Sequence, residues 1–391
     1  MTRSMTSASQ AAQRAFSPER TAGIEIPTDR EIARLHVGDP CFRTPRHIID
    51  AATAAMAEGY TNYPPSSGDP ELRRAIAARA SARATHPIDS ADVLVTAGST
   101  EAIFCAFTAL LDPGDEVILF DPIYSLYATL LNQIGAKPVY AAMTAERRPD
   151  LEKLRRAITG RTRMVIINNP VNPTGVVFDE SELRGIAEVA VSNDLLVLAD
   201  EIYDELVFTG TFTSCLAIPE LAERLVYVNG FSKTYAMTGW RLGYLIAPPD
   251  LLRPAQVIHS NIVAGVNWPA QRAGIAALQG PTEPVTEMIA GYDARRHALL
   301  EGLAGTPGLQ PIPPEGAFYL YVGFKFQRPI SSANLTKLLL TEGVAVRSGT
   351  EYGPAGEGYL RLSYSASFDD IRRGAERLRR AFTKLSAGRQ T

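Results

Sequence analysis

The stretch Ser232-Lys233-Thr234-Tyr235-Ala236-Met237-Thr238-Gly239-Trp240-Arg241-Leu242-Gly243 decides how the rest of the sequence is interpreted. It follows the apolar run 225–228, which predicts a buried strand. Lys233 would therefore stand just beyond the end of a sheet, where α/β proteins place their ligands. Arg241 follows among small residues that let the backbone approach another group closely. A single lysine is more often a solvated surface charge, so its role depends on what the other strands carry.

The composition is that of an ordinary globular protein and excludes several classes. The chain has 391 residues, of which 46% are hydrophobic and 21% charged, so we expect two domains or one large domain with an extension. A formal net charge of -3 provides no basic field for nucleic acid or an anionic membrane. No run approaches the roughly 18 consecutive apolar residues of a membrane span. The three cysteines are widely spaced and fit neither a disulfide framework nor a zinc site, which favours a reducing, cytoplasmic location.

Short apolar runs alternate with helical patterns through the middle of the chain. The runs cover residues 93–95, 117–120, 164–167, 195–199, 225–228 and 242–247. Because they are continuously apolar rather than alternating, they predict strands that are covered on both faces, with helices such as 101–111 and 180–192 as the cover. This is the βαβ pattern of an α/β fold with a mostly parallel sheet.

The pattern changes after about residue 281. A long polar helix at 285–303 is followed by mixed strands and helices at 317–322, 333–342, 344–346, 359–363 and 368–385. We therefore expect a large domain over residues 46–283 and a smaller α+β domain over residues 284–391. Residues 21–45 would form an N-terminal segment that joins the small domain. Residues 1–20 are rich in Ser, Ala and Gln, and we expect them to be a disordered tail.

Two helix starts are visible near the beginning of the large domain. Thr44 is expected to cap the first helix and Pro45 to occupy its first position. Its apolar positions recur at helical spacing and Gly59 ends it; these positions are Ile48, Ile49, Ala52 and Met56. Asp69 and Pro70 repeat the cap-and-proline pattern for the second helix.

Groups suited to ligand binding follow three of the predicted strands. Gly98-Ser99-Thr100 opens a helix, so its hydroxyls and free N–H groups either cradle a phosphate or merely cap the helix. Tyr124 is either a core aromatic or a ring that lies flat over a bound ring. Asn172 belongs to the stiff turn Asn168-Asn169-Pro170-Val171-Asn172-Pro173-Thr174-Gly175, which can hold its amide toward a ligand oxygen.

A fourth strand ends in Asp200. The carboxylate would sit at the mouth of the buried run 195–199, where it costs free energy unless a cation or hydrogen-bond donors meet it. A helix cap is the alternative, but the ligand-type groups at the other strand ends favour a functional carboxylate.

Together these motifs resemble the class I/II aminotransferases, which are pyridoxal-phosphate enzymes of fold type I. Three motifs appear in order: Asn-Pro-x-Asn-Pro-Thr-Gly at 169–175, Asp-Glu-x-Tyr at 200–203 and Ser-Lys-x5-Gly-x-Arg-x-Gly at 232–243. The resemblance runs from about residue 32 to 385. It implies a large pyridoxal-phosphate-binding domain with a mostly parallel sheet and a smaller α+β domain.

The resemblance implies a role for each residue around the cofactor. Lys233 would form the Schiff base with the cofactor aldehyde and, once released, move a proton between the substrate Cα and the cofactor. Asp200 would pair with the protonated pyridine nitrogen and keep the ring an electron sink. Tyr203 and Asn172 would hydrogen-bond the phenolic oxygen of the ring, and Tyr124 would stack on its face.

The phosphate would be held by Ser99, Thr100 and Arg241, with the arginine as the permanently charged partner. Many relatives carry a further serine donor where this chain has Gly230. Ser232 is a candidate to replace that donor.

Three further positions match family sites for the substrate and the partner subunit. Arg361 would bind the substrate α-carboxylate, close to the backbone of Gly38 and to Asn172. Tyr63 would reach across a homodimer interface to the neighbouring cofactor phosphate. No residue stands out as a cation for a substrate side chain. Four residues can either line a substrate pocket or pack in the core: Ile123, Trp268, Phe318 and Tyr319.

The function implied by the resemblance is an amino-acid aminotransferase. Such an enzyme exchanges an amino group between an α-amino acid and a 2-oxo acid by a ping-pong route. A carbon–sulfur lyase or a cyclising synthase with the same cofactor and fold is the alternative. A regulator with an aminotransferase-like domain is disfavoured, because the roughly 30 residues ahead of the domain are too few for a winged helix.

Overall fold

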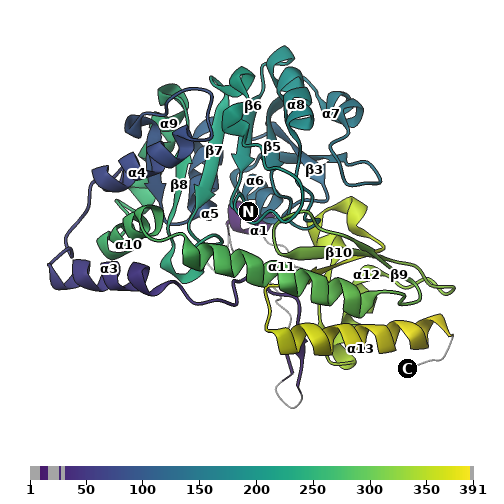
Figure 1. Cartoon of the computed structure of the whole chain (residues 1–391). Coiled ribbons are helices and arrows are strands. Elements are labelled where there is room, and N and C mark those ends of the chain that lie inside the picture. Colours follow the sequence, from purple (N-terminus) through teal and green to yellow (C-terminus); the bar gives the residue numbers. More distant parts are fainter. Residues whose placement is uncertain (1–8, 16–25, 28–30, 388–391) are drawn as a thin grey trace.

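A seven-stranded sheet lies at the centre of the larger part of the molecule (Figure 1). The computed structural model describes residues 9–15, 26–27 and 31–387. The strand order is β2 (Val93–Thr96), β8 (Gly243–Ile246), β7 (Leu225–Gly230), β6 (Leu196–Asp200), β5 (Thr162–Asn168), β3 (Glu116–Asp121) and β4 (Lys137–Ala142). Strand β8 runs antiparallel to both of its neighbours, and the remaining pairs are parallel.

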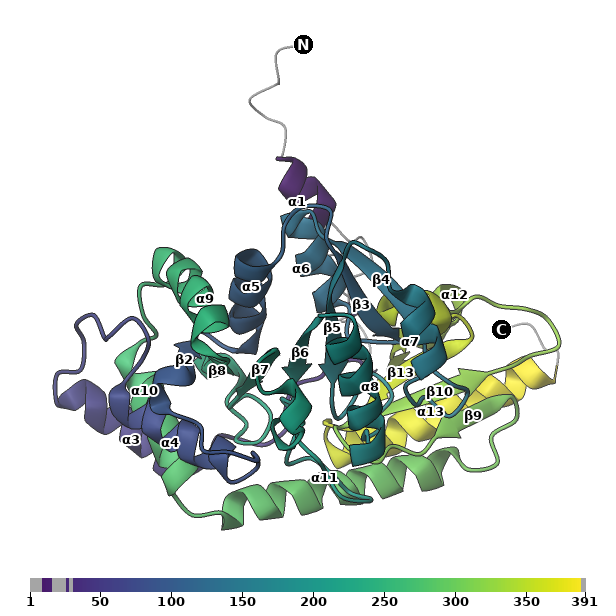
Figure 2. The same ribbon diagram turned by 90° about the horizontal axis from the view of Figure 1, so that it is seen from above.

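Helices cover both faces of this sheet, as Figure 2 shows. One face packs against α5 (Ser99–Leu110), α6 (Leu126–Ile134) and α9 (Pro249–Ile262). The other packs against α3 (Arg46–Ala57), α4 (Pro70–Ser81), α7 (Leu151–Ala157), α8 (Glu180–Ser192) and α10 (Trp268–Gln279). Successive strand residues alternate between the two cores: Val117 and Leu119 face the first, while Ile118 and Phe120 face the second. Both faces are therefore apolar, which explains the continuous apolar runs in the sequence.

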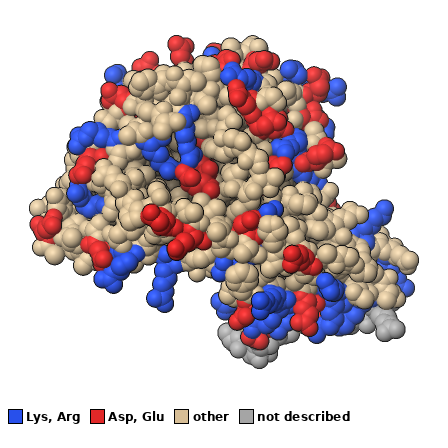
Figure 3. All heavy atoms as spheres, in the orientation of Figure 1, with Lys and Arg blue, Asp and Glu red and all other residues tan. Residues whose placement is uncertain are grey.

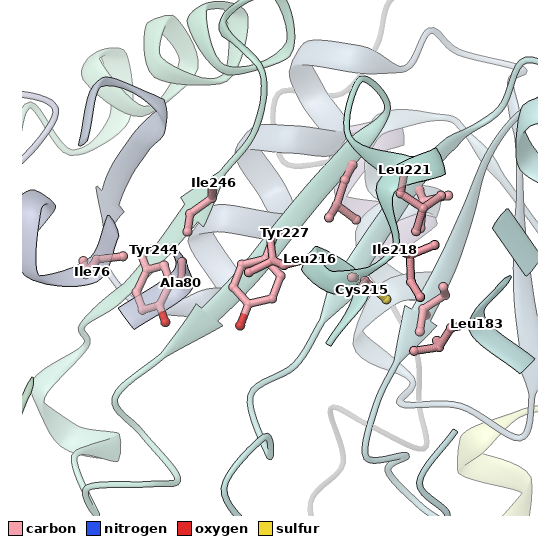
Figure 4. Close-up of a cluster of buried hydrophobic side chains, with 14 of the residues drawn as sticks. Ile76, Ala80, Leu183, Cys215, Leu216, Ile218, Leu221, Tyr227, Tyr244 and Ile246 are labelled. Atoms are coloured by element: carbon pink, nitrogen blue, oxygen red, sulfur yellow. The ribbon is translucent and has the colours of Figure 1, made fainter. Parts of the chain in front are cut away.

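Figure 4 shows part of the second core. Ile76 and Ala80 of α4 lie beside Tyr244 and Ile246 of β8, and a short loop segment around Leu216 and Ile218 closes the space next to Tyr227. The described residues also contain short 3₁₀ helices in the connections between strands and helices. They are η1 (Ser90–Asp92), η2 (Cys215–Ala217), η3 (Pro219–Leu221), η4 (Thr238–Trp240), η5 (Gly349–Tyr352) and η6 (Pro354–Gly356).

The smaller part is built on a four-stranded antiparallel sheet. Its order is β12 (Arg347–Ser348), β13 (Tyr359–Ser363), β10 (Tyr319–Phe324) and β9 (Leu309–Ile312). Helices α11 (Glu283–Leu303) and α13 (Phe368–Ser386) share a core with this sheet, and α12 (Ser332–Thr341) adds to it. The N-terminal strand β1 (Ala33–Arg34) pairs in parallel with β11 (Val344–Ala345), which brings the beginning of the chain to this part. No helix of the described residues is long and apolar enough to cross a membrane.

The predicted fold class is confirmed: a mostly parallel sheet covered by helices, plus a smaller α+β part. The sequence did not predict β4 or β9. Strand β4 lies at the edge of the sheet, has mostly half-exposed or exposed residues and begins with Lys137 and Pro138, which are not typical of a central strand. The domain boundaries at residues 45 and 283 remain predictions.

The N-terminal tail differs from the expectation of disorder. Residues Gln10–Ala15 form helix α1, and the guanidinium of Arg14 donates a hydrogen bond from Nε to the carbonyl oxygen of Asn132 on α6, at 3.1 Å. The rest of the expected tail, residues 1–8 and 16–20, lies outside the described residues.

The start of α3 also differs. The helix begins at Arg46, and Thr44 does not cap it, because its hydroxyl donates to the carbonyl oxygen of Ala236 at 2.7 Å. Ile48 and Ala52 are buried as predicted, but Ile49 and Met56 are 37% and 53% exposed. The predicted cap of α4 is confirmed, since the Asp69 side chain accepts from the backbone N–H of Glu71 at 2.8 Å.

Candidate active site

A cavity of about 540 Å³ lies at the carboxyl ends of the parallel strands, between the large sheet and the small-domain sheet. All of the predicted site residues except Tyr63 line this cavity. The lining residues that were predicted are Gly38, Ser99, Thr100, Tyr124, Asn172, Asp200, Tyr203, Ser232, Lys233, Arg241 and Arg361. Parallel strands end at one edge of a sheet, so residues far apart in the chain meet there. Figure 3 shows basic and acidic side chains interspersed on the face in view.

Lys233 extends into the cavity from the turn that follows β7. Its Nζ donates to the carbonyl oxygen of Gly38 at 2.7 Å and lies 5.4 Å from the centre of the Phe318 ring. Burial, together with the positive charges of Arg361 and Arg241, lowers the pKa of Lys233 to about 8, although the carboxylates of Asp39 and Asp200 oppose the change. A sizeable fraction of this amine is therefore neutral near pH 8, as a nucleophile or a base requires.

Asp200 faces the same cavity from the end of β6 and is only 4% exposed. The Tyr127 hydroxyl donates to its Oδ2 at 2.7 Å, and the backbone N–H of Ile202 donates to Oδ1 at 3.2 Å. Burial raises the pKa of Asp200 to about 6, although these two donors oppose the rise. A buried carboxylate of this kind is strongly stabilised when a cationic group binds beside it.

The N-terminus of α5 and Arg241 form what we call the anion cup, made of Gly98, Ser99, Thr100 and Arg241. Gly98 has φ of +89°, and a Cβ there would lie 2.6 Å from Nη2 of Arg241. A Cβ on Gly243 would lie 2.5 Å from the Ser99 backbone nitrogen. Glycine at both positions leaves room for a guanidinium beside free helix N–H groups, which is a set of donors suited to a phosphate.

Arg361 enters the cavity from β13 and is 5% exposed. Its Nη2 donates to the carbonyl oxygen of His36 at 2.8 Å and its Nη1 to Oδ1 of Asn172 at 3.3 Å. The rings of Tyr319 and Tyr352 lie 4.3 and 5.0 Å from the guanidinium carbon. Its Nε is buried with no hydrogen-bond partner among the described residues. A permanent charge with neutral partners and a spare donor is prepared to receive a carboxylate.

Two hydrogen-bonded pairs hold the remaining predicted residues in place. The hydroxyls of Tyr203 and Tyr319 share a hydrogen bond of 2.9 Å. Asn172 donates from its backbone N–H to Oδ1 of Asn168 at 2.8 Å, while Nδ2 of Asn168 donates to the carbonyl oxygen of Asp200 at 3.0 Å. The stiff turn is thereby tied to the strand that carries Asp200.

Three of the four residues offered for a substrate pocket do not line the cavity. Ile123 is buried in the core against α5 and α6, Phe318 is buried in the core of the smaller part, and Trp268 packs edge-on against Tyr60. Tyr319 does line the cavity. A larger residue at Gly230 would be tight, because a Cβ there would lie 3.1 Å from Cα of Gly243. Ser232 lines the cavity as predicted.

Sequence reasoning missed several lining residues, among them Tyr127, Asn168, His36, Tyr352 and Arg347. Tyr127 lies three residues after Tyr124, in the first turn of α6, and this closeness to Tyr124 in the sequence was the available signal. Burial lowers the pKa of His36 to about 4, together with the charges of Arg347 and Arg361. Arg347 also pairs with Glu351 at 3.2 Å.

The sequence matches known proteins over nearly its whole length. The family model described as aminotransferase class I and II matches residues 30–378. The chain belongs to the class I and II aminotransferase family. It is therefore an aminotransferase, as the geometry of Lys233 and the anion cup had suggested.

Individual relatives of this aminotransferase carry different substrate names. An aspartate aminotransferase of Geobacillus stearothermophilus is 35% identical over 359 residues, which are 90% of this chain and 91% of the relative. A solved alanine aminotransferase from Pyrococcus furiosus has a TM-score of 0.90 and 31% identity, and the match covers 97% of this chain and 100% of that one. A solved aromatic aminotransferase from Pyrococcus horikoshii has a TM-score of 0.88 and 32% identity, with 96% and 99% covered.

Glu201, next to Asp200, gives a testable pH effect on stability. Its side chain is fully buried and accepts from the Ser214 hydroxyl and the Cys215 N–H, each at 2.6 Å. Burial raises its pKa from 4.5 to about 7. Because the folded-state pKa lies above the unfolded one, the stability that the protonated group contributes is complete below pH 4.5 and is lost as the pH rises through 7.

We expect Glu201→Gln, which stays neutral, to avoid this loss. The free energy of unfolding of the variant relative to wild type should rise by roughly 3 kcal/mol between pH 4.5 and 8, measured by urea titration. Glu152→Gln, whose side chain is 70% exposed, is the matched control and should show no such trend. A relative free energy that stays flat for Glu201→Gln would contradict the assignment of a neutral carboxyl.

Proposed function

We propose that this enzyme binds pyridoxal 5′-phosphate in the cavity and transfers amino groups between α-amino acids and 2-oxo acids by a ping-pong route. The observation that carries the proposal is the placement of Lys233, Asp200, the anion cup and Arg361 around one cavity. Each fits a different part of the reactants: an aldehyde, a protonated pyridine nitrogen, a phosphate and an α-carboxylate.

The donors present fit the cofactor. In this proposal Ser99, Thr100 and Arg241 hold its phosphate, with Ser232 as a further donor, and Asp200 holds the pyridine nitrogen. Tyr203 and Asn172 bind the phenolic oxygen, and Tyr124 covers the ring face. When bound, pyridoxal 5′-phosphate supplies an aldehyde that condenses with amines and a ring that accepts electrons from the substrate Cα.

Arg361 fixes the substrate through its α-carboxylate in a bidentate geometry, aided by Asn172 and the backbone at Gly38. The neutral amine of Lys233 would take the proton from the substrate Cα and hold it as an ammonium for the second half of the transfer. Its lowered pKa suits both steps, because a base is most effective when its pKa lies near the working pH. The buried carboxylate of Asp200 would keep a proton on the pyridine nitrogen of the cofactor, since an ion pair at this depth is shielded from water.

A half-reaction tests transamination directly. Holoenzyme given an amino donor alone should convert its cofactor to the aminated form and release one equivalent of 2-oxo acid, followed by absorbance and mass spectrometry. Adding a 2-oxo acid should reverse the change. Release of pyruvate and ammonia from a thioether amino acid, without the aminated cofactor, would instead identify a lyase.

We also propose a homodimer in which Tyr63 reaches the partner's cofactor phosphate, and a cytoplasmic location. Tyr63 is 91% exposed and lies outside its own cavity. Apolar side chains are also exposed on α3 and α9, namely Ile49, Met56, Val257 and Ile262, which supports burial of these surfaces by a second copy. The cysteines, all free thiols, support a reducing compartment.

The dimer proposal predicts a specific effect of Tyr63→Phe. The variant should remain dimeric by light scattering but bind pyridoxal 5′-phosphate about tenfold more weakly, because it loses one hydrogen bond to a charged group. Tyr140→Phe removes a hydroxyl from another exposed tyrosine, on β4, and should leave the affinity unchanged. A monomeric wild-type protein, or equal affinity in both variants, would refute the shared site.

A further inference from the structure

A buried side-chain bridge connects the anion cup to the loop that carries Tyr63. Glu101, in the first turn of α5, accepts from the backbone N–H of Ala97 through Oε2 at 2.7 Å. Its Oε1 lies 2.8 Å from Nδ1 of His259 on α9. On the other side of the imidazole, Nε2 lies 2.9 Å from the carbonyl oxygen of Ser66. The bridge thus spans three segments that are remote in the sequence.

Both ring nitrogens of the buried imidazole have an oxygen partner. Nδ1 of His259 lies against the Glu101 carboxylate and Nε2 against the carbonyl oxygen of Ser66. Burial alone would raise the pKa of Glu101, but the hydrogen bonds from His259 and Cys105 outweigh it and lower that pKa. His259 is 0% exposed, and a buried polar side chain of this kind is stable only where its hydrogen bonds are satisfied.

The two ends of the bridge are both functional elements. Ala97 precedes Gly98 in the turn that aims Ser99 and Thr100 into the cavity, so the Glu101 carboxylate holds this turn much as a capping box does, one residue further out. Ser66 belongs to the loop that follows Tyr63, and its hydroxyl lies 2.5 Å from that of Ser260 on α9. The same short stretch of α9 therefore holds this loop twice.

We propose that His259 and Glu101 are positioning residues that set the anion cup of one subunit and the Tyr63 loop in register, so that each subunit shapes the phosphate sites of both. Neither Glu101 nor His259 lines the cavity. This inference rests on the proposed cofactor and dimer, but the bridge itself is a property of the single chain.

The experiment compares two ligands that differ only in the phosphate. His259→Phe keeps a ring but removes both hydrogen bonds, so affinity for pyridoxal 5′-phosphate should fall about tenfold, while affinity for pyridoxal should change less than twofold. Glu101→Gln should preserve the bridge, because its amide oxygen can accept from the Ala97 N–H and its amide nitrogen can donate to Nδ1 of His259. Cys105→Ala removes a 3.0 Å contact to the same Glu101 oxygen outside the bridge and is the matched control.

A second measurement does not depend on any ligand. In His259→Phe, amide hydrogen exchange of the ligand-free chain should accelerate in residues 60–68 and 97–102 together, and not elsewhere. Equal loss of affinity for both ligands, or the same loss in Cys105→Ala, would overturn the proposal. So would exchange that accelerates uniformly. If wild type binds no pyridoxal 5′-phosphate, the proposed cofactor is wrong, while the exchange result still decides whether the bridge exists.

Discussion

Lys233→Ala should abolish transamination, with turnover at least about 10⁴-fold below wild type. The variant loses both the amine that would hold the cofactor aldehyde and the base that would move the proton from the substrate Cα. No other lysine among the described residues lines the cavity, so no neighbouring amine can substitute. Initial rates with an amino donor and a 2-oxo acid measure the loss, and the visible absorbance of bound cofactor should change at the same time.

The matched control for this variant is Lys153→Ala on α7. The side chain of Lys153 is 47% exposed and does not line the cavity. This substitution removes the same group from the surface and should retain wild-type turnover. Thermal melting of both variants shows whether the fold survives. A folded Lys233→Ala enzyme with wild-type turnover would remove the central assignment of the site.

Arg361→Leu should lower kcat/KM for the best amino donor by about 10³-fold. Leucine fills part of the space between the Tyr319 and Tyr352 rings but leaves the α-carboxylate without its charged partner, a loss of roughly 4 kcal/mol for a bidentate buried pair. Affinity for the cofactor should stay within a few-fold of wild type, because Arg361 is assigned to the substrate. Steady-state kinetics and cofactor titration together separate these two effects.

A pair of substrates sharpens the same prediction. Wild type should strongly prefer an α-amino acid to the corresponding amine without a carboxylate, and Arg361→Leu should lose most of that preference. Arg361→Lys keeps a charge but not the planar fork, so it should fall between the two. An unchanged preference in Arg361→Leu would show that the α-carboxylate binds elsewhere.

The central sheet was predictable because its strands are buried on both faces. Runs such as 164–167 and 195–199 are apolar at every position, because these strands contribute side chains to the cores on both faces of the sheet. The antiparallel direction of β8 was not predictable, because an apolar run looks the same for a parallel and an antiparallel strand. The edge strand β4 was not predicted, because its place in the sheet depends on its pairing with β3, which the sequence pattern does not show.

The site was predictable where its residues follow strands and less so where they meet only through the fold. Asp200 and Lys233 each follow an apolar run, so the sheet itself brings them to one edge. Tyr319 meets Tyr203 from across the domain boundary, and Tyr127 reaches Asp200 from α6. No spacing in the sequence encodes such contacts. The assigned roles of the site residues, and the partner contact of Tyr63, stay predictions.

The pairing of β1 with β11 has a consequence for synthesis on the ribosome. Ala33 is hydrogen-bonded beside Val344, so its partner emerges about 310 residues later. At the usual elongation rates this interval is roughly 15 to 60 s. Throughout it, the core around Leu35, which is 0% exposed in the finished protein, lacks its C-terminal members. We therefore expect chaperones to occupy the nascent N-terminal segment, and chains released before residue 361 to possess a cofactor cup but no grip on substrate.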